Sequence, residues 1–335
     1  MPKNSENMLE FNKLINWYLN DDTLTNNDQY LDDLVSKNIS SHFKLLKISP
    51  KKKLIRKMVK IPNYSMKIIN KKDKDYAKTF KRLSNEVKKN KHYFFDFLIH
   101  GSFSTGDYIK GWSDLDTYVI IKNNVLADHN NLKKLKKFII KIKKYLYEID
   151  PIQHHGFIFC PQKYLKNYKS FMLPSKVLEK SKSFINERKL IIFENINNNY
   201  PINHLKSINN LLFNAYKNGF LEHHKYKNKY LLENYKDKKT MYQMKYFLSI
   251  VMTLPTYFLH SKGRPIYKKK SFEKVKKFFD SEWEIIDTAT KIRFLWATKQ
   301  KHPFRGNNIP LWLEKSLGKN YFKRAYILSN KLIDN

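Results

Sequence analysis

The stretch that decides the fold is GSFSTGDYIKGWSDLDTYVII, residues 101–121, which directly follows the apolar run YFFDFLIH at residues 93–100. The whole chain contains only eight glycines, and three of them fall in this stretch. Two aspartates, Asp114 and Asp116, then form a D-x-D pair inside an apolar run. This arrangement predicts a strand, a tight Gly-Ser link and a second strand that carries both carboxylates.

The two carboxylates indicate the chemistry of the site. Alternate side chains of a strand point to the same side, so we expect Asp114 and Asp116 to share one face. Two buried carboxylates without a counter-charge carry a heavy desolvation cost, and a divalent cation such as Mg²⁺ removes it. Gly101 and Ser102 offer backbone N–H groups and a hydroxyl to a phosphate. The residues therefore predict a metal–triphosphate site.

The segments around this stretch predict a compact α/β unit. We expect helices at 75–91 and 131–147, a helical turn at 104–109, and strands at 94–100, 115–122 and 152–160. After Pro161 the pattern changes to long helices. These are expected at 203–218, 225–259, 271–279, 283–299 and 309–332.

Composition and pattern together predict three parts. They are a helical and basic N-terminal extension (residues 1–72), a compact α/β core (73–162) and a helical C-terminal domain (163–335). The first 33 residues are acidic, whereas residues 34–72 contain no Asp or Glu. A polyanion-facing patch and a solvated basic face are both open explanations of this switch.

The formal net charge of the chain is +35. A field of this sign attracts RNA, DNA, nucleotides or anionic lipid headgroups. Alternatively, the high lysine content reflects a biased genomic composition, and the lysines only solvate helix faces. Both explanations of the net charge stay open. In either case the charge favours a phosphate-bearing substrate over a cationic one.

The chain shows no sign of export or membrane insertion. The N-terminus lacks the apolar segment of a signal peptide, and the longest apolar run, residues 246–259, is too short to span a bilayer. The single cysteine, Cys160, cannot form an intramolecular disulfide. We therefore expect a cytoplasmic protein that does not bind membranes.

The motif also carries a resemblance. A Gly-Ser pair, eleven intervening residues and D-x-D in an apolar strand resemble the signature of the nucleotidyltransferase superfamily related to DNA polymerase β. The element order over residues 75–162 agrees, and the C-terminal region is similar to the helical domains that follow this core in small members. The resemblance implies an α+β fold, in which a small α/β core with a mixed sheet is followed by an all-helical domain.

The resemblance further implies an activity. Members of this superfamily bind an NTP such as ATP with two Mg²⁺ ions and transfer a nucleoside monophosphate to an acceptor hydroxyl, releasing pyrophosphate. By position, Asp114 and Asp116 would hold the metals, and Gly101 and Ser102 would bind the β- and γ-phosphates.

Two further points concern the other substrate groups. Lysines of the helical domain, with Lys245 and Lys270 as candidates, are expected to contact the triphosphate or the acceptor. Three acceptors stay open at this point: a small hydroxylated molecule, an RNA 3′ end and a protein side chain.

One position departs from the family pattern. Active members usually carry a third carboxylate on the next strand, where this chain has Gln153, His154 and His155. Asp150 could begin the strand close enough to serve as the third acid. Alternatively, a histidine, above all His155, could act as general base, because imidazole titrates near neutral pH. As a third alternative, the histidines are hydrogen-bonded residues of an inactive core.

The departure leaves a second class of function open. The chain could be a catalytically inactive nucleotide- or RNA-binding module, or an antitoxin-like regulatory protein whose helical domain binds a protein partner. The chemistry of the third strand separates these alternatives from the enzyme.

Overall fold

The computed structural model describes residues 4–23, 29–48, 54–153, 155–169, 173–194, 200–218, 241–279, 281–300 and 309–335. The chain forms two compact units. Unit 1 consists of Met1–Tyr108, Ser113–Asp150 and His155–Asn197, and unit 2 of Ile109–Trp112, Pro151–His154 and Asn198–Asn335. The three-part division that we expect from composition stays a prediction.

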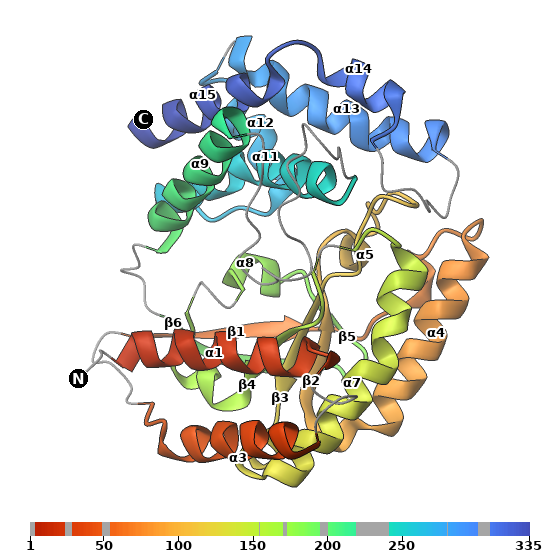
Figure 1. Ribbon diagram of the computed structural model, residues 1–335, viewed down its shortest axis with the longest axis vertical. Coiled ribbons are helices and arrows are strands. Elements are labelled where there is room, and N and C mark those ends of the chain that lie inside the picture. The colour runs from red at the N-terminus through yellow and green to blue at the C-terminus, as the bar shows by residue number, and fades with distance from the viewer. Residues whose placement is uncertain are drawn as a thin grey trace. The chain divides into compact units, whose positions relative to one another are not determined.

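Unit 1 is built on a four-stranded mixed sheet (Figure 1). Its strands are β2 (Phe94–Ile99), β3 (Thr117–Ile121), β4 (Ile158–Pro161) and β5 (Lys182–Ser183). They lie in the order β4-β3-β2-β5, with β3 and β4 parallel and the other pairs antiparallel. Every residue of β3 is buried, as expected for a strand inside the sheet. The mixed sheet confirms the predicted fold class.

Helices cover this sheet. They are α1 (Asn4–Asn20), α3 (Gln29–Leu45), α4 (Lys74–Lys89), α5 (Ser102–Thr105), α6 (Asn123–Ala127), α7 (His129–Ile149) and α8 (Ser175–Leu178), with 3-10 turns η1 (Met66–Ile68), η2 (Lys91–Tyr93) and η3 (Gln162–Asn167). The predicted helices at 75–91 and 131–147 are confirmed as α4 and α7. Each presents a periodic apolar face to the core, for example through Phe80 and Leu83 or Leu135 and Ile139.

A second, two-stranded antiparallel ribbon lies in unit 1. It consists of β1 (Ile55–Ile61) and β6 (Arg188–Glu194). Val59 and Ile61 on β1 and Leu190 and Ile192 on β6 are buried in the core of the unit. These two strands and β5 are not among the elements predicted from the sequence.

The N-terminal helices belong to the same core. Phe11 and Ile15 of α1 and Phe43 of α3 are buried in one cluster with the strands of the sheet. Lys51, Lys52 and Lys53, the centre of the basic run, lie outside the described residues.

Helix α1 closes the free edge of the sheet. Asn16 donates its side-chain amide to the carbonyl of Phe159 (2.9 Å) and accepts from the N–H of the same residue (2.8 Å). Asn20, one turn further along, does the same with Phe157, at 2.9 and 3.1 Å. The two amides replace a neighbouring strand along β4 and satisfy backbone groups that an edge strand leaves unpaired.

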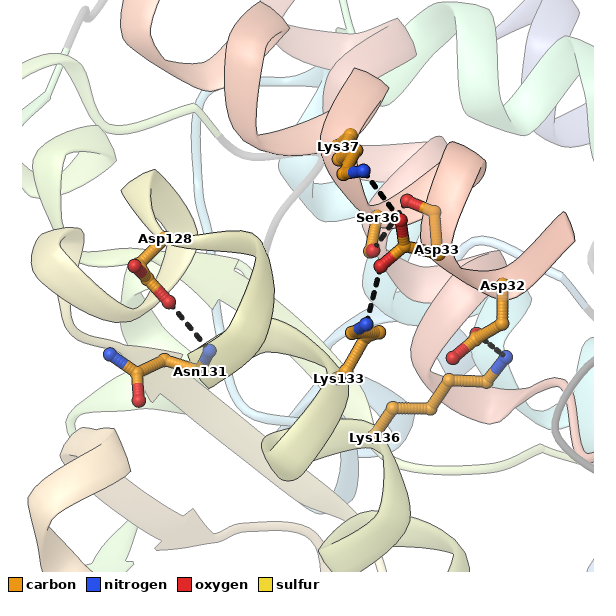
Figure 2. A network of polar contacts seen from close by, with 8 residues as sticks. All are labelled: Asp32, Asp33, Ser36, Lys37, Asp128, Asn131, Lys133 and Lys136. Atoms are coloured by element: carbon orange, nitrogen blue, oxygen red, sulfur yellow. Dashed lines mark hydrogen bonds and ion pairs between the residues drawn. The ribbon is translucent and has the colours of Figure 1, made fainter. Parts of the chain in front are cut away.

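Ion pairs fasten α3 to α7 (Figure 2). The Lys136 ammonium, which is fully buried, lies 2.8 Å from the carboxylate of Asp32, and Asp33 pairs with both Lys133 and Lys37. The hydrogen bonds from these two lysines hold the pKa of Asp33 at about 2. Because a buried charge is costly without its partner, the Asp32–Lys136 pair fixes how α3 packs on α7.

Two predicted strands are shorter than expected. Strand β3 begins at Thr117, so Asp114 and Asp116 precede the strand. The pairing with β2 ends here because the chain turns away at Gly101. The last backbone hydrogen bond between the two segments runs from the N–H of His100 to the carbonyl oxygen of Asp116. Strand β4 begins at Ile158 rather than at residue 152. Asp150 is instead the C-terminal cap of α7, and its N–H donates to Leu146 O.

Unit 2 is helical, as predicted. Its helices are α9 (Tyr200–Lys217), α11 (Met241–Ser261), α12 (Lys268–Lys276), α13 (Glu284–Lys299), α14 (Leu311–Leu317) and α15 (Tyr321–Asp334), with the 3-10 turn η4 (Ser281–Trp283). The described part of the predicted helix at 225–259 lies in α11, which runs through Pro255. Within the described ranges, no helix has the length and apolar character needed to cross a membrane.

Removing the side-chain amide of Asn20, which bonds both backbone groups of Phe157 directly before β4, should destabilise unit 1. Asn20→Ala leaves the buried N–H and C=O of Phe157 without partners, and we expect a loss of about 2–4 kcal/mol in the free energy of unfolding. Urea denaturation followed by circular dichroism measures this change. Asn130→Ala, at an exposed position of α7, is the control and should stay within about 0.5 kcal/mol of wild type. Equal losses of unfolding free energy in the two variants would contradict a stabilising role of the Asn20–Phe157 hydrogen bonds.

Candidate active site

The site begins at the turn after β2. Gly101 has φ +64° and ψ −151°, a conformation that is essentially restricted to glycine. A Cβ at this position would lie 2.0 Å from Oδ2 and 2.9 Å from Cγ of Asp116. The absence of a side chain therefore lets the Asp116 carboxylate pack directly against the backbone of the Gly-Ser turn.

Three side chains of unit 1 converge beside this turn. The Nε2 atom of His155 lies 3.3 Å from Oδ2 of Asp114 and 3.1 Å from Oδ1 of Asp116. The other ring nitrogen, Nδ1, lies 3.2 Å from the carbonyl oxygen of Gly156. Because both nitrogens face oxygen atoms that can only accept, the ring carries two protons in this arrangement.

The electrostatics agree with this geometry. Burial alone would lower the pKa of His155, but its hydrogen bonds to Asp114 and Asp116 and their negative charges raise it to about 10. Burial would raise the pKa of Asp116, but the hydrogen bond from His155 and the charges of His100 and His155 lower it below its usual value. The site thus contains an ionised Asp116 carboxylate beside a cationic His155 ring.

The donor set fits a hard divalent cation. One nitrogen of His155 contacts an oxygen atom from each carboxylate, so the two carboxylates converge on a single point. Mg²⁺ is commonly held by one or two protein carboxylates and completes its shell with water and substrate phosphates. Among the described residues, no group of three or more His, Cys, Asp or Glu side chains is arranged to hold a metal ion. Asp114 and Asp116 are the two carboxylates that would hold such an ion.

The structure also shows where four other residues named from the sequence lie. Ser102 is the first residue of α5, directly after Gly101, and is partly exposed. Asp150 is fully buried at the end of α7. Gln153 is buried in unit 2, and His154 lies outside the described residues. Of the candidates for the third position, the structure places His155 in contact with both aspartates.

The two candidate lysines lie in unit 2. Lys245 is on α11 and only 1% exposed, whereas Lys270 is exposed on α12. Their contact with a triphosphate or an acceptor stays a prediction.

Sequence reasoning missed one residue of the site. His100, which is buried, ends the apolar run before the Gly-Ser turn, and its N–H donates to Asp116 O at 3.0 Å. Its charge also lowers the pKa of Asp116. The signal in the sequence is the position of His100 directly before Gly101. The last residue before this turn pairs with the chain segment that carries Asp116, and therefore lies close to that carboxylate.

Comparison with known proteins identifies this part of the chain. Residues 80–190 match the family model of the nucleotidyltransferase domain. This domain, which contains the turn, both aspartates and His155, belongs to the nucleotidyltransferase superfamily, and the protein is a transferase of phosphorus-containing groups. No curated protein and no solved structure matches the chain.

Adding a methyl group at the turn should disable the site. Gly101→Ala forces a backbone conformation that alanine rarely adopts and displaces the Asp116 carboxylate. A displacement of about 1 Å can cost a hundredfold in rate, so we expect nucleotidyl transfer to fall at least about a hundredfold. Pyrophosphate release measures this loss.

Gly106→Ala is the matched control at the other end of α5. Gly106 also has a positive φ, +82°, but a Cβ there meets only a side-chain carbon of Ile68 at an ordinary 3.7 Å. This variant should lose about 1–2 kcal/mol of stability and keep its activity within about twofold. If Gly101→Ala and Gly106→Ala lost activity equally, backbone strain and not the displacement of the Asp116 carboxylate would explain the loss.

Proposed function

We propose that the protein is a Mg²⁺-dependent nucleotidyltransferase that moves a nucleoside monophosphate from an NTP to an acceptor hydroxyl and releases pyrophosphate. The observation that carries this proposal is the convergence of Asp114 and Asp116 next to the Gly101 turn. The acceptor is a small hydroxylated molecule or an RNA end.

The protein's own groups position and neutralise the reactants. Asp114 and Asp116 would hold two Mg²⁺ ions, which, when bound, neutralise the phosphate charge and polarise the attacking hydroxyl. Backbone N–H groups at Gly101 and Ser102, together with the Ser102 hydroxyl, would bind the β- and γ-phosphates. No covalent intermediate with the protein is needed, because fixed charge and in-line orientation account for catalysis in this class of reaction.

We assign His155 a positioning role. Its ring touches both carboxylates with one nitrogen and the Gly156 carbonyl with the other, and so holds the two acids in a common orientation. In this contact the imidazole donates protons, which favours positioning over the role of general base.

The experiment is pyrophosphate release from each of the four NTPs, with candidate acceptors and Mg²⁺. We expect one preferred NTP for the wild-type protein and a loss of at least about a hundredfold in Asp116→Asn, because a neutral amide cannot balance the metal charge. Asp75→Asn, an exposed carboxylate in the first turn of α4, should retain wild-type activity.

The outcome also decides between enzyme and binding module. Turnover that survives Asp116→Asn unchanged would place the chemistry elsewhere. No turnover, together with no Mg²⁺-dependent binding of any NTP, would contradict the enzyme and leave an inactive binding module, such as one for RNA, as the function.

A further inference from the structure

Unit 1 contains a groove that the nucleotidyl-transfer site does not use. It has a volume of about 390 Å³. Its lining residues are Arg56, Asn123, Gln162, Lys163, Leu165, Lys166, Ile191 and Phe193. Three of them are cations, two are amides, three are apolar, and none is acidic.

The groove lies at the other end of the strands from the carboxylates. Asp116 and His155 precede β3 and β4, whereas Asn123 and Gln162 follow these two parallel strands. With about 3.3 Å per residue, the groove and the carboxylates are roughly 15–20 Å apart. The groove is therefore a separate site.

One wall comes from the β1–β6 ribbon, through residues that lie outside the matched domain. Arg56 on β1 lies directly opposite Phe193 on β6, and Met58 opposite Ile191. Because side chains alternate and Val59, Leu190 and Ile192 face the core, these four residues share the outer face of the ribbon. Glu194, the nearest acid along β6, points to the opposite face by the same alternation.

The opposite wall is held together by hydrogen bonds. The N–H of Lys163 donates to the side chain of Asn123 (2.9 Å), and its ammonium donates to the carbonyls of Phe43 (2.5 Å) and Leu46 (2.9 Å) at the end of α3. Burial lowers the pKa of Lys163 to about 8. Arg56 and Lys166 are exposed, and neither pairs with a carboxylate of the described chain. Two cations are therefore available to a ligand.

We propose that this groove binds single-stranded nucleic acid, with phosphates on Arg56 and Lys166 and a base against the ring of Phe193. Unpaired cations beside an aromatic ring in an apolar groove are the combination that single strands use, since the backbone supplies charge and the bases supply flat apolar faces. The absence of acids among the lining residues provides the charge complementarity. The site does not depend on the transferase reaction.

Fluorescence anisotropy with labelled 12-nucleotide RNA and DNA of the same sequence tests the proposal. We expect the wild-type protein to bind with an affinity that falls steeply with salt. Arg56→Gln/Lys166→Gln should weaken binding about tenfold or more and reduce the slope of log K against log salt by about 1.4, because two phosphate contacts are lost. Phe193→Leu, which keeps an apolar side chain but removes the ring, should weaken it about tenfold.

The control removes the same charge elsewhere in unit 1. Lys134 and Lys137 are exposed on α7, so Lys134→Gln/Lys137→Gln lowers the net charge equally without touching the groove. This variant should bind within about twofold of wild type. Three results would each overturn the proposal. The two double variants could weaken binding equally; polyphosphate could bind as tightly as RNA while Phe193→Leu has no effect; or neither oligonucleotide could bind.

Discussion

The carboxylate of Asp116 packs against the backbone of Gly101 with no room for a side chain between them. At this contact the pairing of β2 with β3 ends and the chain turns into α5. A nearby positive charge stabilises two neighbouring carboxylates. In this structure His155 supplies that charge, and its position depends on where β4 begins.

The beginning of β4 is determined by helix α1, far away in the sequence. Asn20 binds both backbone groups of Phe157, two residues after His155, and thereby fixes the segment that brings the imidazole to the aspartates. Helix α3 is fastened in turn to α7 by the buried Asp32–Lys136 pair. The N-terminal helices lie outside the region matched to the nucleotidyltransferase domain, yet they complete its sheet edge and its core.

Local patterns explain what the sequence could predict. The Gly-Ser link and the D-x-D pair identify the domain and supply two candidate site residues, because both are contiguous and chemically unusual. The periodic apolar faces of α4 and α7 are visible for the same reason. Strands β1 and β6 cannot be recognised from local sequence, because each is stabilised by a partner more than a hundred residues away. Whether Asp150 or His155 lies beside the two aspartates cannot be read from the sequence either, since it depends on the contact between Asn20 and Phe157.

The central claim is that Asp114 and Asp116 form a cation site that a divalent metal shares with a triphosphate. Mn²⁺ titration followed by electron paramagnetic resonance, with a non-hydrolysable NTP present, tests it in wild type and in His155→Asp. This substitution replaces a cationic ring by the carboxylate usual in active members. The account predicts NTP-dependent Mn²⁺ binding by the wild-type protein and a Kd at least several-fold lower in the variant. No NTP-dependent Mn²⁺ binding, or a Kd unaffected by the substitution, would contradict it.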